Sequence, residues 1–404
     1  MLAATLSHSD QRSLVLVLAA SVAAAFLSRI VRGLVLPTVV PEIVLGILIG
    51  PEVLGWASPG RYVDFLSNLG LAMLFFFAGL EVVEKHVPRG PIVRGTSGWA
   101  ISCAIAIPIG YLLHLFGLGA EGWLLGIAIS TTSLGTLVPI LSDSGIVRTP
   151  LGLAVLGTGV AGEFWPVIVI SVFLTGIYGA ATEVGLLVAF GALAFLAAFA
   201  ALRARPSRPL EIIRETLHST GQAGVRLSIL VLAALVLLAL DGGFDFILGA
   251  FAAGLVVGVV LDTPEGHVVR MRLEGIGFGF LIPIYFVATG LSFDIDSLLN
   301  ARGLGLAALF LALMLSVRGA SALLWLRELG PHETASLALY GATALPLIAA
   351  IVTVGLQRGA IAADVGASLV GAGMISVLAF PLLAGLTSPA GDAPESRVEA
   401  TMEI

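Results

Sequence analysis

The stretch STTSLGTLVP, from Ser130 to Pro139, places five hydroxyl groups, a glycine and a proline inside an apolar segment. Proline removes a backbone donor and clashes with the preceding turn, so carbonyl groups are left without partners. The related stretch YGATALP, from Tyr340 to Pro346, lies inside a second apolar segment. The two stretches predict two interrupted helices, and the residues expected at the interruptions are Pro139, Thr343 and Pro346.

Each interruption has two interpretations. It can be a kinked helix whose hydroxyl groups bond back to its own backbone, or a discontinuous helix that presents carbonyl and hydroxyl oxygens to an ion. In lipid, freed backbone groups must be satisfied within the protein or by a bound ligand. Because the interruptions take corresponding positions in the two halves of the chain, the second interpretation is favoured.

The composition is that of a polytopic membrane protein. Hydrophobic residues make up 58% of the 404 residues and charged residues 11%, with a mean hydropathy of +1.06. Soluble domains have roughly 25% charged residues. Nucleic-acid binding is excluded because no basic stripe is present. The single cysteine, Cys103, excludes a disulfide or a cysteine metal site within the chain. No cofactor is predicted.

Loop signals divide the chain into 13 candidate membrane spans of about 20 residues each. If the spans alternate in direction, 15 basic residues collect on one side and 4 on the other. The positive-inside rule then places the N-terminus outside and the C-terminus in the cytoplasm, in the cell (inner, plasma) membrane. The spans are expected near residues 13–31, 36–55, 63–83, 95–116, 122–142, 151–176, 182–202, 225–241, 243–261, 274–292, 303–325, 334–356 and 363–386.

The two halves of the chain resemble each other. PEIVLGILIG is echoed by FDFILGAFAAG, FFFAGLE by YFVATGLS, and STTSLGTLVP by YGATALP, at separations of 203, 211 and 207 residues. The separation corresponds to seven spans, an odd number, so the second copy is expected to be inverted, as in many secondary transporters. The expected organisation is a first half in 1–202, a basic cytoplasmic linker in 203–224, a second repeat in 225–387 and a disordered tail in 388–404.

Glu163 is the only formal charge in the apolar segment 151–176, where it lies within GTGVAGEFWPVIV. A charge at the centre of a span costs about 2.5–3.5 kcal/mol even on a lenient scale. Burial disfavours the charged carboxylate and a nearby cation favours it. Protons and cations therefore compete for one group, which favours antiport. The alternative is a protonated glutamate that serves packing.

Arg318 is the second embedded charge, in ALMLSVRGASALLW. Arginine keeps its proton in proteins, so it needs a partner. Two roles are open: a structural arginine bonded to the carbonyl groups of a broken helix, and a fixed countercharge near the ion pathway.

These segments together resemble the monovalent cation/proton antiporters, in particular the Kef-type and prokaryotic sodium/proton exchanger branch. The similarity covers residues 13–386 and rests on LPTVVPEIVLGILIGPEVLGW, LGLAMLFFFAGLEV, and the run from STTSLGTLVP through GTGVAGEFWPVIV. It implies an all-α membrane fold of 13 helices in two inverted repeats with crossed broken helices. It also implies a homodimer, with a core domain that moves against a scaffold domain.

The resemblance assigns the site residue by residue. It implies that Glu163 binds the ion and the proton in turn, that Arg318 is its charge partner, and that the first break coordinates the cation through Thr131, Thr132 and Ser133. Gly162 stands where the family usually has an aspartate or asparagine, and Leu345-Pro346 where it often has Gly-Glu. With one carboxylate, electroneutral exchange of one Na⁺ or K⁺ for one proton is expected.

Other functions are weighed against exchange. A proton-coupled transporter of an organic anion on the same scaffold is the alternative, with Arg318 binding the anion. An enzyme is not expected, because no span has a Gly-x-Ser-x-Gly motif and there is no metal-ligand cluster. The expected partners are a monovalent cation, the proton and membrane lipid.

Overall fold

The computed structural model describes residues 8–30, 37–83, 88–173, 222–261 and 263–387, and their regular structure is helical apart from one isolated bridge between Ala120 and Ile361. The predicted all-α fold is confirmed. The helices are α1 His8–Ile30, α2 Val39–Ile49, α3 Arg61–Val83, α4 Arg89–Leu115, α5 Gly122–Ser130, α6 Leu134–Asp143, α7 Pro150–Phe173, α10 Ala223–Asp241, α11 Phe246–Val260, α12 Pro264–Ile276, α13 Ile282–Leu291, α14 Ile295–Leu299, α15 Ala301–Ala322, α16 Leu326–Gly341, α17 Leu345–Gln357 and α18 Ala363–Thr387.

The chain is an integral, multi-pass membrane protein by the length and apolarity of its helices. Within the described ranges, eight helical runs are long and apolar enough to cross a bilayer, and three shorter apolar helical runs accompany them. The count of 13 spans stays a prediction. The span expected at 182–202 and the tail at 388–404 lie outside the described residues, as does the linker at 203–224 except for its last three residues.

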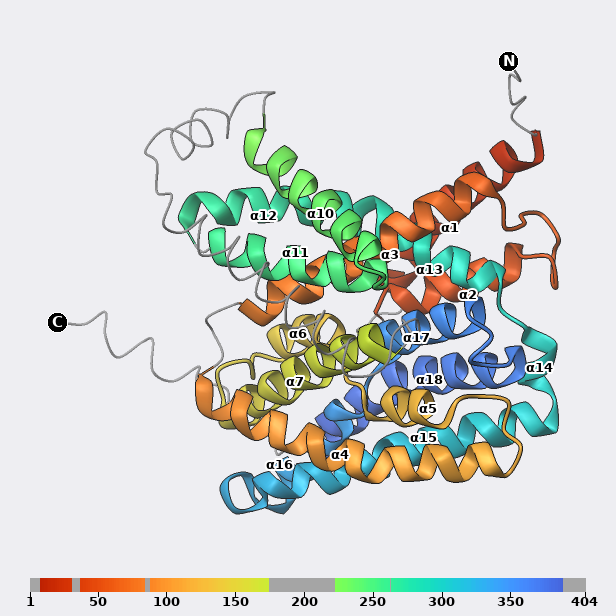
Figure 1. The fold of residues 1–404 in the computed structure, drawn as a ribbon. Helices are drawn as coiled ribbons and strands as arrows, with labels where there is room; N and C mark the ends of the chain where they lie inside the picture. Colours follow the sequence, from red (N-terminus) through yellow and green to blue (C-terminus); the bar gives the residue numbers. More distant parts are fainter. Residues whose placement is uncertain (1–7, 31–36, 84–87, 174–221, 262, 388–404) are drawn as a thin grey trace.

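The helices form two groups, visible as the upper and lower halves of Figure 1. The first group contains α1 to α3 and α10 to α13, and the second contains α4 to α7 and α15 to α18. The groups meet through side chains such as Phe164 of α7 and Phe251 of α11, whose ring centroids are 5.6 Å apart. A cavity of about 240 Å³ also opens between them, lined among others by Asp64, Tyr285 and Thr353.

Glycines set two close helix crossings in the first group. A Cβ added at Gly46 of α2 would collide with the carbonyl of Val287 and with Gly290 in α13, and one at Gly290 would collide with α2. The same arrangement joins α11 to α3: a Cβ at Gly254 would collide with the carbonyl of Phe76 and with Gly79. Removing the side chain at each crossing lets two backbones touch.

Candidate functional site

The first helix break lies at Thr131–Ser133. Helix α5 ends at Ser130, Thr131 is extended with φ −75° and ψ 160°, and α6 begins at Leu134. All three residues of the break are buried. The expectation that Pro139 marks the interruption is wrong, because Pro139 lies within α6, six residues after the break. One missing amide bond inside a helix does not by itself open it, whereas the hydroxyl residues of the break bond elsewhere.

The second break lies at Ala342–Ala344, between the end of α16 at Gly341 and the start of α17 at Leu345. Pro346 follows the break in the first turn of α17. Its missing N–H costs nothing there, because the first amides of a helix have no intrahelical acceptor. Proline therefore starts the second half-helix and does not interrupt it.

The two breaks contact each other directly. The amide of Ser133 donates to the carbonyl of Thr343 over 2.9 Å, and Ser133 Oγ accepts the amide of Leu347 at 3.4 Å. Thr132 Oγ1 donates to the carbonyl of Gly341 over 2.5 Å. Five residues from two distant segments therefore form one buried polar junction.

Two of the break hydroxyls bond back to their own helices. Thr131 Oγ1 donates to the carbonyl of Ala128 over 2.8 Å, and Thr343 Oγ1 to that of Leu339 over 3.3 Å. The kinked-helix interpretation is therefore right for these two side chains, while Thr132 and Ser133 bond across the junction. The oxygens of all four hydroxyls keep lone pairs that can face a cation.

Glu163 lies in α7 beside the first break, with 9% of its surface exposed. Its Oε2 accepts the amide of Leu134, the first residue of α6, over 3.1 Å. The N-terminus of a helix carries a partial positive charge, so a carboxylate is favoured at this end. The structure thus gives the expected buried carboxylate a specific partner, the start of the half-helix α6.

Gly162 allows α7 to approach the first break. The amide of Thr132 donates to the carbonyl of Gly162 over 3.0 Å. A Cβ at position 162 would lie 2.8 Å from both Cβ and Oγ1 of Thr132, closer than real Cβ contacts come. In this chain, Thr132 occupies the space that a side chain at position 162 would need.

Arg318 of α15 is buried, with 1% of its surface exposed. It bonds to the C-terminal ends of α5 and α16, the half-helices that precede the two breaks. Its Nε donates to the carbonyl of Gly341 at 3.1 Å, and its Nη1 to the carbonyl of Ser130 at 3.4 Å and to Ser102 Oγ at 3.3 Å. Gly341 ends α16 and Ser130 ends α5, so the cation lies at two helix C-termini, where positive charge is favoured. These bonds are those expected of an arginine that holds broken-helix carbonyls, while its buried Nη2 has no hydrogen-bond partner among the described residues.

Ser376 of α18 belongs to the same junction and was not anticipated from the sequence. It is fully buried, and its Oγ accepts the amide of Ala344 in the second break at 3.4 Å. A single serine in an apolar helix carries no signal that separates it from serines bonded to their own helix. Only the position of the break identifies it.

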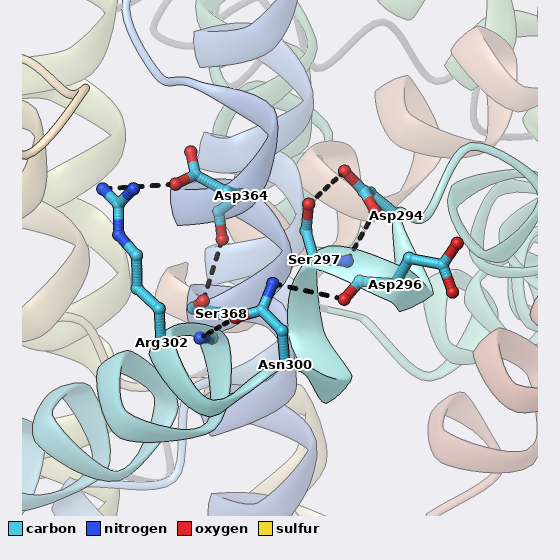
Figure 2. Close-up of polar contacts among 8 residues, drawn as sticks. Asp294, Asp296, Ser297, Asn300, Arg302, Asp364 and Ser368 are labelled. Carbon is cyan, nitrogen blue, oxygen red and sulfur yellow. Dashed lines mark hydrogen bonds and ion pairs between the residues drawn. The ribbon is translucent and has the colours of Figure 1, made fainter.

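A second set of polar contacts lies where α14 joins α15 and meets α18 (Figure 2). Asp294 caps α14 by accepting the amide of Ser297 at 2.8 Å, and Arg302 pairs with Asp364 of α18 at 3.4 Å. Figure 2 also shows Ser368, whose hydroxyl bonds to the carbonyl of Asp364. These contacts close helix ends and leave the junction at the two breaks as the candidate site.

Comparisons with known proteins agree on one family. Residues 17–385 match the family model described as sodium/hydrogen exchanger, transmembrane. The chain is 29% identical over 401 residues to the protein YjbQ of Bacillus subtilis, covering 93% of this chain and 63% of YjbQ. It is 28% identical over 282 residues to the Na⁺/H⁺ antiporter of Enterococcus hirae, covering 66% and 70% of the two chains.

A solved structure shares the fold. The sodium proton antiporter MjNhaP1 from Methanocaldococcus jannaschii superposes with a TM-score of 0.67 at 17% identity, over 93% of this chain and 98% of that one. At this identity the likeness concerns the fold alone. The chain spans about two thirds of the length of the curated relatives described above.

Proposed function

Because the chain belongs to the sodium/hydrogen exchanger family, we propose that it exchanges a monovalent cation, Na⁺ or K⁺, for protons across the membrane. Glu163 carries the cation and the proton in turn. The observation that carries the proposal is the placement of this buried carboxylate at the start of α6, beside the junction of two helix breaks. Discontinuous helices that meet at a polar point are where transporters of this kind bind ions.

The chemistry follows from the groups around Glu163. The carboxylate is buried, so its charge requires compensation, which either a proton or a cation supplies. The N–H of Leu134 stabilises the charged form at the moment when one ligand leaves and the other arrives. Hydroxyl oxygens of Thr131, Thr132 and Ser133 supply hard ligands suited to an alkali cation. Binding of one ligand therefore excludes the other.

Arg318 sets the charge balance of the site. It neutralises the negative ends of α5 and α16 and bonds to their carbonyls, so it stays fixed while Glu163 titrates. Glu163, as the carboxylate that exchanges its ligand, carries one proton or one monovalent cation. Exchange is therefore one for one and electroneutral.

Alternating access is proposed to be of the elevator type. The second helix group, which contains Glu163, moves as a core domain against the first group as a scaffold. The cavity of about 240 Å³ between the groups supports this proposal, because Glu163 is not among the residues that line it. An opening that stops short of the site fits a protein that exposes the site to one side at a time.

The inverted repeat is part of the proposal, with its halves in 1–202 and 225–387 and a linker at 203–224. The matching glycine crossings support it: Gly46 lies 208 residues before Gly254, and Gly79 lies 211 before Gly290. The breaks also match at a separation of 211 residues, from Ser130 to Gly341. We further propose a homodimer in the cell membrane, with the N-terminus outside, acting as a transporter without a resident cofactor and not as an enzyme.

Reconstitution in liposomes tests the function. Protein is inserted into vesicles that contain a pH dye, and Na⁺, K⁺, Li⁺ or an organic anion is added outside. We expect an alkali cation to drive proton movement that Glu163→Gln abolishes. Glu42→Gln is the matched control, since Glu42 of α2 is also a buried carboxylate, 4% exposed, outside the site.

Two outcomes would contradict the proposal, and a third would show that the assay is not specific for the site. Cation-driven proton movement that persists in Glu163→Gln would exclude this carboxylate as the site. Proton movement driven by an organic anion and lost in Arg318→Ala would favour the anion transporter. Loss of exchange in Glu42→Gln to the same degree would show that the assay reports folding and not the site.

A further inference from the structure

Each of the two breaks packs against one helix of the second group, α7 at the first break and α18 at the second. A glycine of α7 faces the first break, because a Cβ at Gly162 would overlap Thr132. A glycine of α18 faces the start of α17, directly after the second break, because a Cβ at Gly373 would lie 3.2 Å from Cα of Leu345. Gly373 follows Gly162 by 211 residues, the same separation as the ends of α5 and α16. Helices α7 and α18 therefore take equivalent places.

Each supporting helix also caps the half-helix that follows its break. Glu163 of α7 accepts the amide of Leu134 at 3.1 Å, and Ser376 of α18 accepts the amide of Ala344 at 3.4 Å. The hydroxyl proton of Ser376 is donated to the carbonyl of Gly373 over 2.7 Å. Its oxygen is therefore turned toward Ala344 as an acceptor.

The two caps act on adjacent parts of one junction. The amide of Ser133 donates to the carbonyl of Thr343, and the capped amides belong to the next residues along each chain, Leu134 and Ala344. The junction is thus matched in its glycines and its carbonyl ends, and each side has a cap, although Ser376 lies two positions beyond Met374, the residue that the separation of 211 pairs with Glu163. The caps also differ in charge: the first cap is a carboxylate and the second is a neutral hydroxyl.

We propose that Ser376 is the counterpart of Glu163 in the second half of the chain. It is a positioning residue that fixes the start of α17 at the ion site. This inference rests on the proposed function and adds a residue that governs the affinity for the cation.

The physical reason is electrostatic. A helix N-terminus carries about half a positive elementary charge. Glu163 compensates the start of α6, while the start of α17 has only a neutral acceptor. The positive end of α17 therefore weakens the binding of any cation at Glu163. Removing the hydroxyl strengthens this opposition, and a carboxylate at position 376 reverses it.

Substitutions at Ser376 test the proposal in the liposome assay, with the cation KM measured at alkaline pH and the pH of half-maximal exchange measured at fixed cation. Ser376→Ala should raise the KM by about two- to fivefold, the range of a helix-end charge effect. Ser376→Asp should lower the KM and move the pH midpoint upward, because an added negative charge retains both cation and proton. Ser376→Thr keeps the hydroxyl and should resemble the wild type.

Ser368→Ala is the matched control. Ser368 lies in the same helix and is fully buried, but its hydroxyl bonds only to the carbonyl of Asp364, one turn earlier in α18. Its loss should leave the KM and the pH midpoint unchanged. A KM in Ser376→Ala equal to that of Ser368→Ala would overturn the positioning role.

The remaining outcomes are also decisive. A Ser376→Asp protein that elutes as one species and keeps the wild-type KM and pH midpoint would overturn the electrostatic role. If that variant aggregates, a raised KM in Ser376→Ala that Ser376→Thr does not share supports the proposal, and equal values in both contradict it. Wild-type protein that moves no protons with any cation would instead overturn the proposed function.

Discussion

Arg358 and Asp245 form an ion pair that joins the two helix groups. Nη2 of Arg358, the residue after α17, donates to Oδ2 of Asp245 over 3.0 Å. Asp245 precedes α11 and caps it, because Oδ1 accepts the amide of Ile247 at 3.2 Å. The side chain of Asp245 is 7% exposed and that of Arg358 is 38% exposed. A nearly buried carboxylate thus depends on a partly exposed cation from the other group.

Because Asp245 is more buried than Arg358, removing the arginine should cost more stability than neutralising the aspartate. Arg358→Gln leaves the Asp245 carboxylate buried with its cap amide but without this cation, and should cost about 1–2 kcal/mol after allowance for exposure. Asp245→Asn removes the charge and keeps a good N-cap, so it should cost less than about 1 kcal/mol. Thermal unfolding in detergent measures both.

The double variant provides the check on this pair. Asp245→Asn combined with Arg358→Gln should unfold at a higher temperature than Arg358→Gln alone, because no uncompensated carboxylate remains. Additive losses in the double variant would show that the two side chains do not stabilise the protein through each other.

Competition at Glu163 predicts how pH and cation concentration interact. If proton and cation exclude each other from one carboxylate, each tenfold increase in cation above its dissociation constant should move the pH of half-maximal exchange about one unit lower, by mass action. The sign follows because more cation displaces the proton at lower pH. Initial rates in vesicles at several Na⁺ concentrations measure the midpoint. A midpoint that stays fixed would mean that the two ligands occupy separate groups.

The sequence predicted the buried charges and the existence of the breaks, because a charge inside an apolar segment and small polar residues within a span are local signals. The residues named for the breaks, Thr131 to Ser133 and Thr343, do lie in them, but the prolines were wrongly taken as their cause. Pro139 lies within α6 and Pro346 starts α17. The breaks are instead where Thr132 and Ser133 bond to residues about 210 positions away, which no local pattern contains.

The same limit explains Gly162 and Ser376. The resemblance set Gly162 against an aspartate or asparagine of the family, whereas the structure gives it a steric role against Thr132. Ser376 became a candidate only once its hydroxyl was seen to accept the amide of Ala344. The roles of both residues depend on contacts between segments that are distant along the chain. Such contacts cannot be read from the local pattern of a single sequence.

The two nitrogen atoms by which the Arg318 guanidinium bonds to two carbonyls predict that a positive charge alone at this position does not support full exchange activity. Its Nε and Nη1 reach the carbonyls that end α16 and α5, and a lysine ammonium is a single point that cannot hold both in the same geometry. Arg318→Lys should therefore lower the exchange rate at least about tenfold, a loss of roughly 1.4 kcal/mol. Arg302→Lys is the control, since the Arg302 side chain is 65% exposed and pairs with Asp364 alone (Figure 2). Wild-type rates in Arg318→Lys would show that a positive charge at this position is enough.

Gly162 predicts a steric effect on the ion site. In Gly162→Ala, the new Cβ would lie 2.8 Å from Cβ and Oγ1 of Thr132, and a β-branched side chain in a buried break has little freedom to move away. Thr132 should lose its 2.5 Å bond to the carbonyl of Gly341, so we expect exchange to fall and stability to drop by about 1–3 kcal/mol. Gly305→Ala is the control, because nothing lies within 4 Å of a Cβ at that position of α15. That variant should be as stable as the wild type or slightly more so, since alanine favours helix. If Gly162→Ala and Gly305→Ala have the same stability and the same exchange rate, the close packing of Thr132 against Gly162 is contradicted.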